Sequence, residues 1–560
     1  MTLAEYLDSC EQRYSGELHL LGGPFHGPGY HSRVADGTYV HDILNSADYA
    51  VALLKAGDAA PPARAADVLR KILSLQDTDP TSTTYGLWPW LAEEPLSQMA
   101  PPDHNWADFV GARLAQVLKD HAARLPADLV DPLRAGLAHA AWSIFRRNVG
   151  PDYTNVAVAG AGVALAAGEL LGAPRLLDYG RRRLHNLVAH TKFHGGFNEY
   201  NSPTYTLVAL HECERTLSLV RDAQARSDAE RLRRAAWQTV AEHFHPGTGQ
   251  WAGPHSRAYT LRLGSGALEY LSAQTHVDLR RGPPGPQRPA PALVPAIECP
   301  SALVPRFQAL PEPQVEVRGR FIRREPDEAS TWGTAWMAED ACLGSVSQDN
   351  MWTQRHVLIA YWRTAEDPAA ALRLRFLRDG RDFASAFVRT VQSGPRALSV
   401  FNLVTDLGDF HHCLDRPAGG VFEAGDFRVR YELSCSGGVA AAHALGAGRF
   451  VLAAGGRRAV VHPMPGRFGP YEVRWTAGKE GDSAFVDGIC YCESRLPFDL
   501  ARFGKIILAA GLELLGPTEA PAAAAPELEE HTEDRICVVW NLPAGGLMVT
   551  APARPHPYPK

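Results

Sequence analysis

The stretch PPGPQRPAPALVP, residues 283–295, is followed by CPSALVP at 299–305 and LPEP at 310–313, so proline recurs from about residue 280 to 313. Proline has a fixed φ and no backbone N–H, and a stretch so rich in it disfavours both a helix and a central strand. We therefore expect a linker at residues 281–313. It would separate one domain, residues 1–280, from another, residues 314–560.

Before this linker, apolar residues recur at the spacing of an amphipathic helix. The helical segments are expected near residues 44–55, 63–75, 104–124, 127–147, 153–172, 174–190, 203–220 and 226–243. Connections such as Leu125-Pro126 and Gly172-Ala173-Pro174 are short. Short connections predict that consecutive helices run antiparallel, as hairpins.

After the linker, the pattern changes to alternating or β-branched runs separated by turn residues, which is typical of strands. These runs are Val315–Arg324, His356–Trp362, Ala371–Leu377, Ala397–Leu403, Phe427–Cys435, Arg457–His462 and Ile536–Trp540. Residues 516–530 are expected to form a loop before one or two last strands. The predicted fold is therefore multidomain, α and then β, with an antiparallel β-sandwich as the second part.

Composition narrows the classes of function. The chain has 560 residues, is 45% hydrophobic and carries a formal net charge of −6, which fits a globular protein of several domains and disfavours a nucleic-acid partner. No run of about 18 apolar residues is free of charge, so a membrane span is not expected. The acidic start (Glu5, Asp8, Glu11) does not resemble a secretory signal, and nine scattered cysteines fit a reducing compartment. We expect a cytoplasmic location.

Unusual polar and aromatic residues gather at helix starts. Ser202 and Thr154 are expected to cap two helices, and His104-Asn105-Trp106 opens a third. Because these helices are two steps apart in an alternating array, their amino ends should share one rim, together with the loop after residue 243 and the connection at 88–94. The candidate ligand-contacting residues are Trp88, Trp90, Glu93, Glu94, Asn105, Trp106, Asn198, Glu199, Asn201, Trp251 and Tyr259.

Such a rim suits an anionic ligand. Each helix amino end carries about half a positive charge, and Arg257 adds a full one. The tryptophans offer flat apolar faces for sugar rings, although packing is an equally ordinary role for them. The stretch Asp349–Arg355, polar and aromatic between two expected strands, is a further candidate for ligand contact or for ordinary strand surface.

The segment His194-Gly-Gly-Phe197-Asn198-Glu199-Tyr200-Asn201-Ser202-Pro203-Thr204-Tyr205 resembles a stretch of the toroidal polysaccharide lyases, the hyaluronate/chondroitin AC lyase and heparinase II/III-like group. An Asn about 50 residues upstream and a Ser-Arg pair about 50 downstream match Asn155 and Ser256-Arg257. The resemblance implies an incomplete (α/α) toroid followed by a β-sandwich. The sequence differs from the family in two places. Tyr200 stands where the family has its catalytic His, and Asn155 is followed by Val156 instead of the His of the heparinase-like Asn-His pair.

The resemblance implies β-elimination at a uronic acid, which needs a group that neutralises the carboxylate, a base and an acid. Asn155, with Arg257 or His255, is the candidate neutraliser. Tyr205 is the candidate base and acid, because positive surroundings lower the pKa of a phenol. Tyr200 is a candidate for part of the proton transfer. Helix capping for Asn155, packing for the two tyrosines and an ordinary loop position for His255 are the structural alternatives.

Hydrolysis is the rival reaction. Glycoside hydrolases need two carboxylates beside the bond, and Glu93, Glu94, Asp103, Asp108 and Glu199 all map to the expected rim. A (α/α)-barrel hydrolase acting on a glucuronoside therefore stays open, as does a non-catalytic glycan-binding protein.

Cofactors and partners follow from the remaining residues. His411-His412-Cys413 and Cys490-Tyr-Cys492 are candidate metal ligands, but no second pair stands at a useful spacing, so we expect no obligatory metal and no cofactor. The expected partner is an acidic oligosaccharide or small uronide. Self-association is left open.

Overall fold

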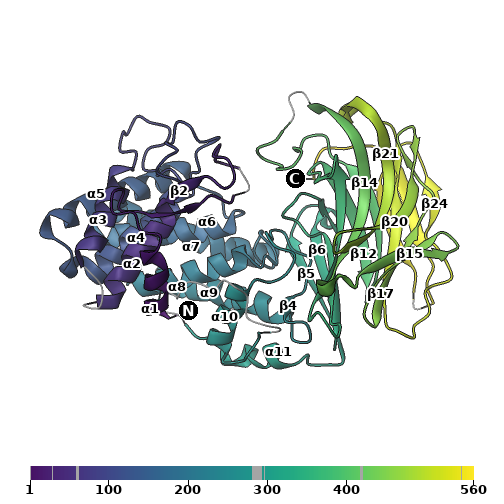
Figure 1. Ribbon diagram of the computed structural model, residues 1–560, viewed down its shortest axis with the longest axis horizontal. Helices are drawn as coiled ribbons and strands as arrows, with labels where there is room; N and C mark the ends of the chain where they lie inside the picture. Colours follow the sequence, from purple (N-terminus) through teal and green to yellow (C-terminus); the bar gives the residue numbers. More distant parts are fainter. Residues whose placement is uncertain are drawn as a thin grey trace. The chain divides into compact units, whose positions relative to one another are not determined.

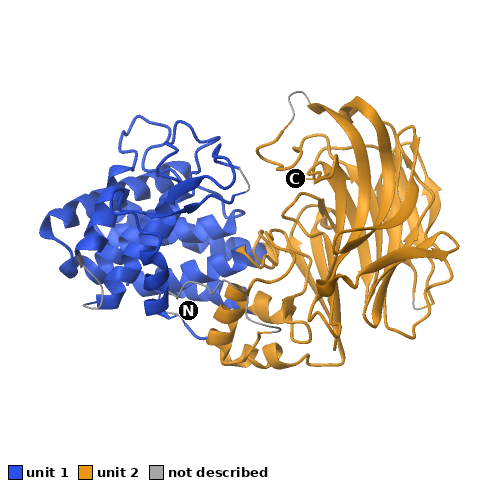
Figure 2. Ribbon diagram, in the orientation of Figure 1, with its two compact units in different colours: residues 1–193, 205–237, 285–298 blue, residues 194–204, 238–284, 299–560 orange. Residues whose placement is uncertain are grey.

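The computed structural model describes residues 2–27, 30–57, 62–280, 293–294, 297–416, 420–543 and 545–559. Two compact units make up the chain (Figure 2). Unit 1 comprises residues 1–193, 205–237 and 285–298, and unit 2 comprises residues 194–204, 238–284 and 299–560.

Unit 1 is built of helices (Figure 1). They are α1 (Leu3–Glu11), α2 (Ile43–Ala56), α3 (Pro62–Ser74), α4 (Trp106–His121), α5 (Ala127–Arg147), α6 (Thr154–Leu170), α7 (Pro174–His194), α8 (Tyr205–Leu219) and α9 (Ala223–His243), the last residues of α7 and α9 belonging to unit 2. Each predicted helical segment corresponds to one of them. A hairpin of β1 (Leu21–Pro24) and β2 (Tyr39–Asp42) precedes α2.

Helix α6 lies at the centre of unit 1. Residues 154–168 are all buried, and the helix packs against α4, α5 and α8. Small residues allow close packing around α6. At Gly168, for example, a methyl group would lie only 2.6 Å from the backbone nitrogen of Leu177 in α7. Within the described residues, no helix is both long and apolar enough to cross a membrane.

Unit 2 is built mainly of antiparallel strands. A nine-stranded sheet has the order β20 (Arg474–Glu480), β21 (Ser483–Asp499), β14 (Val421–Ser434), β10 (Ala370–Arg378), β9 (Leu358–Trp362), β7 (Ala341–Val346), β6 (Thr331–Ala338) and β5 (Gln314–Ile322), with β11 (Arg381–Asp382) beside β10. A seven-stranded sheet has the order β15 (Ala441–Gly446), β16 (Arg449–Ala454), β17 (Arg457–Pro463), β23 (Ala509–Leu515), β13 (Arg396–Leu403), β12 (Ala386–Ser393) and β8 (Gln348–Asn350).

The two large sheets share one apolar core, which confirms the predicted sandwich. Phe376 and Phe427 come from the nine-stranded sheet, and Val461 and Leu512 from the seven-stranded one. A smaller sheet, β24 (Glu527–His531), β25 (Arg535–Trp540) and β26 (Leu547–Pro552), covers the other face of the seven-stranded sheet. It follows the predicted loop at 516–530, although β24 starts inside that range.

Alternation along β13 explains how one strand serves both layers. Ala397 and Phe401 belong to the sandwich core, whereas Leu398 and Val400 pack against the smaller sheet. Since successive side chains of a strand point to opposite faces, a strand covered on both sides is apolar at nearly every position. This is why the run appears continuous in sequence.

The units do not divide at the predicted linker. Of residues 281–313, residues 281–292 and 295–296 lie outside the described part of the chain. The rest includes two short helices, η3 (Ser301–Leu303) and α11 (Pro305–Gln308), and Phe307 is buried against Phe244. Residues 194–204 and 238–280, predicted as parts of the helical domain, belong to unit 2, and backbone hydrogen bonds such as those from Ser256 to Tyr200 and from Ala258 to Gln354 lie within that unit.

A close approach in unit 2 gives a stability test. A methyl group on Gly344, in β7, would lie 1.9 Å from the carbonyl oxygen of Gly253, so the backbone must shift to admit it. We expect Gly344→Ala to lower the free energy of unfolding by about 1–3 kcal/mol and to lower the melting temperature of unit 2, measured by calorimetry. Gly319→Ala is the matched control, because nothing lies within 4 Å of that position in β5. Equal melting temperatures for the two variants would contradict the expectation.

Candidate functional site

Helices α4, α6 and α8 run parallel, as the alternation predicts. Asp108 of α4 lies beside Gly160 of α6, and three residues later Gly111 of α4 lies beside Val163 of α6. Because both contacts move forward along the chain together, α4 and α6 run in the same direction. For α6 and α8, the Glu169 carboxylate accepts the N–H groups of residues 221 and 222 just beyond α8, at 2.9–3.0 Å. The amino ends of all three helices therefore lie at one end of unit 1.

Asn155 and Tyr205 lie at this end. A methyl group on Gly162 would lie 2.5 Å from Thr216 Oγ1, which fixes the register of α6 against α8. Asn155 precedes Gly162 by seven residues and Tyr205 precedes Thr216 by eleven, so Tyr205 reaches about 6 Å farther along the axis. Asn155 is fully buried, and Tyr205 is half-buried as the first residue of α8.

Other predicted rim residues of unit 1 form a connected cluster. The indoles of Trp90 and Trp106 stack with 5.1 Å between ring centroids, and Trp90 donates to the Asp103 carboxylate at 3.1 Å. The Asn105 side chain donates to the Tyr153 hydroxyl at 3.1 Å and accepts from Arg147 at 2.8 Å. The structure thus brings Trp90, Asn105 and Trp106 together, each partly exposed.

Asp108 is a buried carboxyl in the first turn of α4. Burial raises its pKa to about 7, against the opposing effect of the Arg147 and Arg183 guanidiniums. The Arg147 guanidinium lies 3.8 Å from its carboxylate. A carboxyl group of this kind exchanges its proton near neutral pH.

Ser202 and Thr154 do not cap helices as predicted. Helix α8 begins at Tyr205, three residues after Ser202, and the Ser202 hydroxyl donates to the carbonyl oxygen of Arg257 at 2.6 Å. Thr154 is itself the first residue of α6, whose N-cap, Tyr153, makes no side-chain capping bond. The Ser-Pro pattern marks a turn before the helix, and the serine side chain ties that turn to the Arg257 loop.

Asn201 holds that loop within unit 2. Its side-chain nitrogen donates to the carbonyls of Ala252 and Pro254 at 2.9 and 2.8 Å, and its oxygen accepts from the Trp251 indole at 2.5 Å. The residue has φ of 42°, a left-handed conformation that asparagine tolerates. These three hydrogen bonds of the Asn201 side chain all hold the loop in place, so the side chain is not placed to bind a sugar.

Arg257 presents a restrained cation. Its Nε donates to Gln354 Oε1 at 2.8 Å, its Nη1 lies 3.4 Å from the Glu199 carboxylate, and its guanidinium lies over the Trp352 ring at 5.1 Å. Gln354 and Trp352 belong to the Asp349–Arg355 stretch. The structure therefore joins two predicted regions, about 100 residues apart, around one guanidinium.

A buried carboxylate lies behind this loop. Asp349 accepts from the hydroxyls of Tyr200 and Tyr558, each at 2.7 Å, and pairs with Arg355. Tyr200 is stacked on Phe321 with 4.5 Å between centroids and is 1% exposed. Burial and the neighbouring Asp349 raise the pKa of Tyr200 well above its ordinary value. A phenol in this setting retains its proton, so Tyr200 is suited to holding Asp349 and Arg355 in position.

His255, predicted to assist the neutraliser, is buried and neutral. Its Nδ1 lies 2.9 Å from the Asn201 carbonyl oxygen, and its backbone pairs with that of His356. Burial lowers the pKa of His255 to about 4. A neutral histidine carries no charge near pH 7, so His255 does not add a second positive charge beside Arg257.

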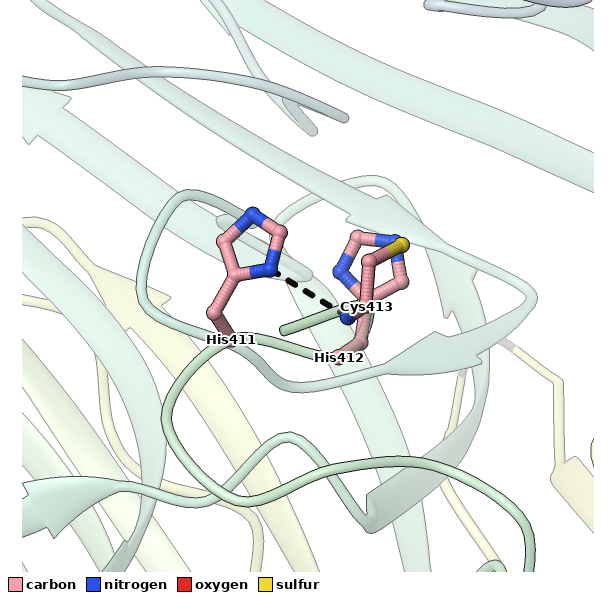
Figure 3. A group of neighbouring side chains, drawn as sticks. All are labelled: His411, His412 and Cys413. Atoms are coloured by element: carbon pink, nitrogen blue, oxygen red, sulfur yellow. Dashed lines mark hydrogen bonds between the residues drawn. The ribbon is translucent and has the colours of Figure 1, made fainter. Parts of the chain in front are cut away.

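A histidine-rich turn lies close to the same arginines. His411, His412 and Cys413 have ligand atoms within 4.8 Å of one another (Figure 3), the one such group among the described residues. Trp352 contacts both imidazoles, at 5.1 and 4.4 Å between ring centroids. Burial, followed by Arg355, His411, Arg257 and Arg416, lowers the pKa of His412 to about 3.

This turn has little of the geometry of a metal centre. The imidazoles stack at 21°, so their in-plane lone pairs do not converge, and His411 Nδ1 accepts the N–H groups of Cys413 and Leu414 at 3.2 Å. Burial raises the pKa of Cys413, which favours the thiol over the thiolate. Nearby guanidiniums disfavour a cation. That no metal is required remains a prediction.

Several predicted ligand contacts have structural roles instead. Trp88 is fully buried and donates to the Ile72 carbonyl oxygen at 2.9 Å, and Trp251 is 1% exposed. Glu93 accepts from the His41 ring at 2.5 Å, and Glu94 accepts the Arg33 N–H at 2.7 Å. Neither tryptophan leaves a face for a sugar ring. Residue type alone did not separate them from Trp90 and Trp106.

The remaining predicted residues are placed as follows. Asn198 is half-buried, and Tyr259 is 51% exposed. The sequence did not indicate the contacts of three residues: Arg147, Tyr558, and Asp349, which accepts hydrogen bonds from two tyrosines. Their partners lie from 42 to 209 residues away along the chain, and no local pattern reports contacts of that range.

The chain is similar to known proteins over much of its length. A family model described as a domain of unknown function (DUF8769) matches residues 14–271. No curated protein matches. Among solved structures, the chain is similar to a chondroitin AC lyase of Streptomyces coelicolor A3 in complex with chondroitin sulphate, at 12% identity over 98% of this chain and 84% of that one, with a TM-score of 0.47.

Two further solved structures are similar. One is heparinase III, at 9% identity over 91% of this chain and 82% of that one, with a TM-score of 0.45. The other is a mutant of the heparan sulfate lyase HepC from Pedobacter heparinus, at 9% identity over 99% and 94%, with a TM-score of 0.41.

The buried histidines predict a pH dependence of stability. The folded pKa values of His255 and His245 are about 4, below the ordinary value of 6.5, so the unfolded chain binds more protons between these values. Stability is therefore complete above pH 6.5 and falls as the pH drops toward 4, by up to about 2 kcal/mol per residue at pH 5.

His255→Asn, which retains a donor for the Asn201 carbonyl, is expected to flatten this slope in denaturant unfolding between pH 7.5 and 5. The exposed His531→Asn is the control and is expected to leave the slope unchanged. An identical slope for wild type and His255→Asn would show that this histidine does not stay neutral in the folded state.

Proposed function

We propose that this protein is a lyase that cleaves a uronic-acid-containing oligosaccharide by β-elimination. The observation that carries the proposal is the placement of Asn155 and Tyr205 at adjacent amino ends of two parallel helices in unit 1. A carboxylate-binding amide and a phenol are thereby held within about one helical turn of each other along the axis. The sequence resemblance supplies the reaction, and this geometry is compatible with it.

Arg257, in unit 2, is the proposed cation of the same reaction. Within unit 2, the Ser202 hydroxyl donates to the Arg257 carbonyl oxygen and so holds the loop that carries this arginine. In the proposal, Asn155 and Arg257 neutralise the uronate carboxylate and so make the neighbouring C–H acidic. Arg257 is held by Gln354 and Glu199, so little ordering remains when the substrate binds.

Tyr205 is the proposed base and then the acid. As a phenolate it takes the proton at C5, and as a phenol it returns a proton to the departing glycosidic oxygen, so protons balance over the cycle. The positive ends of α6 and α8 favour the phenolate form. Tyr200 takes no part in proton transfer in this proposal, because it is buried and bonded to Asp349.

An acidic oligosaccharide small enough to be imported is the proposed substrate, and the cytoplasm is the proposed location. All nine cysteines lie in the described ranges, and no two of them form a disulfide. Unbridged thiols fit a reducing compartment.

Hydrolysis of a glucuronoside is the second candidate, and Asp108 is the observation that favours it. Its pKa of about 7 suits a general acid. Elimination produces a 4,5-unsaturated sugar that absorbs in the ultraviolet, whereas hydrolysis does not. Incubation with uronic acid oligosaccharides, followed by absorbance and by reducing-end analysis, therefore distinguishes the two reactions.

Tyr205→Phe tests the proposed base. We expect kcat for elimination to fall by at least about 100-fold while the dissociation constant of the oligosaccharide changes less than threefold. Tyr39→Phe is the control, since Tyr39 is 62% exposed in unit 1. Full activity of Tyr205→Phe would reject Tyr205 as the base.

Arg257→Gln tests the neutraliser. Loss of one stabilising donor is expected to lower kcat/KM by about 100-fold on a uronate substrate. With the carboxyl methyl ester of the same substrate, the difference between wild type and variant should largely vanish, because no charge remains to neutralise. An undiminished difference on the ester would assign Arg257 a structural role only. Arg502→Gln, an exposed arginine, is the control.

A further inference from the structure

We infer that unit 1 carries a second binding site for an acidic sugar, in a cationic cavity between α5 and α7. The cavity has a volume of about 520 Å³. Its described lining consists of seven residues: Phe145, Arg146, Asn148, Tyr179, Arg182, Arg183 and Asn186. Three are arginines, two are amides, two are aromatic and none is acidic. That the ligand is a sugar rests on the proposed function, whereas the anion site rests on the cavity alone.

Neighbouring arginines of the Arg181-Arg182-Arg183 run differ in their surroundings. Arg181 pairs with Asp222 and with Asp178, as expected for a solvated helix face. Arg182 is exposed at the cavity, whose described lining offers it no carboxylate. Arg183 donates to the Tyr179 hydroxyl at 2.6 Å. The sequence therefore contains one arginine used for a surface ion pair and two that face a cavity.

Helix electrostatics do not account for the charge. Arg146 lies in the last turn of α5, where a cation is stabilised by the helix dipole. Arg182 and Arg183 lie in the middle of α7, where that effect has faded. Asp108 interacts electrostatically with Arg183, but no carboxylate is among the described lining, and like charges cost free energy unless a ligand supplies the opposite charge. This arrangement is typical of an anion site.

The uncharged lining favours a sugar over a simple ion. The Tyr179 hydroxyl contacts Asn148 Oδ1 at 3.2 Å, and the rings of Tyr179 and Phe145 lie 4.7 Å apart at their centroids. Amides match sugar hydroxyls, aromatic rings match the apolar face of a pyranose, and guanidiniums match carboxylate or sulfate groups. The volume falls in the range of small-molecule sites.

Nucleic acid fits less well. Binding of a nucleic acid tracks many successive phosphates along a positive surface. This cavity is lined by only three arginines, and one of them, Arg146, donates to the Pro80 carbonyl oxygen and lies over the Tyr85 ring; the whole chain has a net charge of −6. The site is thus proposed for an acidic oligosaccharide of two to three units. It would retain one part of the substrate and would take no part in bond cleavage.

Titration with a fluorescently labelled, sulfated uronate tetrasaccharide tests this site on the full chain. We expect Arg182→Glu to weaken one class of binding at least tenfold, and Asn186→Ala to weaken the same class severalfold. Neither should change kcat on a disaccharide substrate. The control Arg502→Glu makes the same charge change on exposed unit 2 surface and is expected to have no effect.

Three competitors identify the ligand class. A neutral tetrasaccharide should not compete, inorganic sulfate should compete only weakly, and single-stranded DNA should not displace the probe. Unchanged affinity of Arg182→Glu in a folded protein, or tighter binding of DNA than of the tetrasaccharide, would overturn the inference. If Arg182→Glu weakens binding while Tyr205→Phe leaves turnover intact, the second site stands and the proposed catalytic function fails.

Discussion

The Asn201 side chain is the constraint on which the arrangement of the candidate residues depends. Buried peptide groups must be hydrogen-bonded, and the turn at Ala252–Pro254 is deeply buried. Asn201 satisfies two carbonyls there and also accepts the Trp251 indole N–H. Through this turn, a residue next to Ser202 fixes the loop that carries Arg257. Removing the amide would leave several buried polar groups unsatisfied at once.

Positions in the helical array were predictable because alternation is a geometric rule. Short connections force neighbouring helices to reverse, so every second helix begins at the same end. The amino ends of α4, α6 and α8 follow this rule, which is how residues 50 apart in sequence reach one end of unit 1. The rule fixes which end a helix start occupies but not which way a side chain points. Trp88 and Trp90 illustrate the difference: one is buried, and the other is partly exposed.

The division into units was less predictable, since it depends on where backbone hydrogen bonds go. Residues 194–204 stand between two helices of unit 1, and a linear reading assigns them there. Their partners are Ala252, Pro254 and Asp349, within unit 2. Proline content reports where helices and strands stop, but it carries no information on which residues the chain contacts on either side.

Charge balance around Arg257 shapes the chemistry open to this region of unit 2. Glu199 and Asp349 are each paired with an arginine, Arg257 and Arg355, whose charges they largely offset. The nearby histidines stay neutral because burial lowers their pKa values. Arg416, which donates to the His412 carbonyl oxygen, adds a further positive charge. The region is therefore mildly positive without being a strong cation cluster. Such a region suits the reversible binding of one carboxylate, which the proposed turnover of an acidic substrate requires.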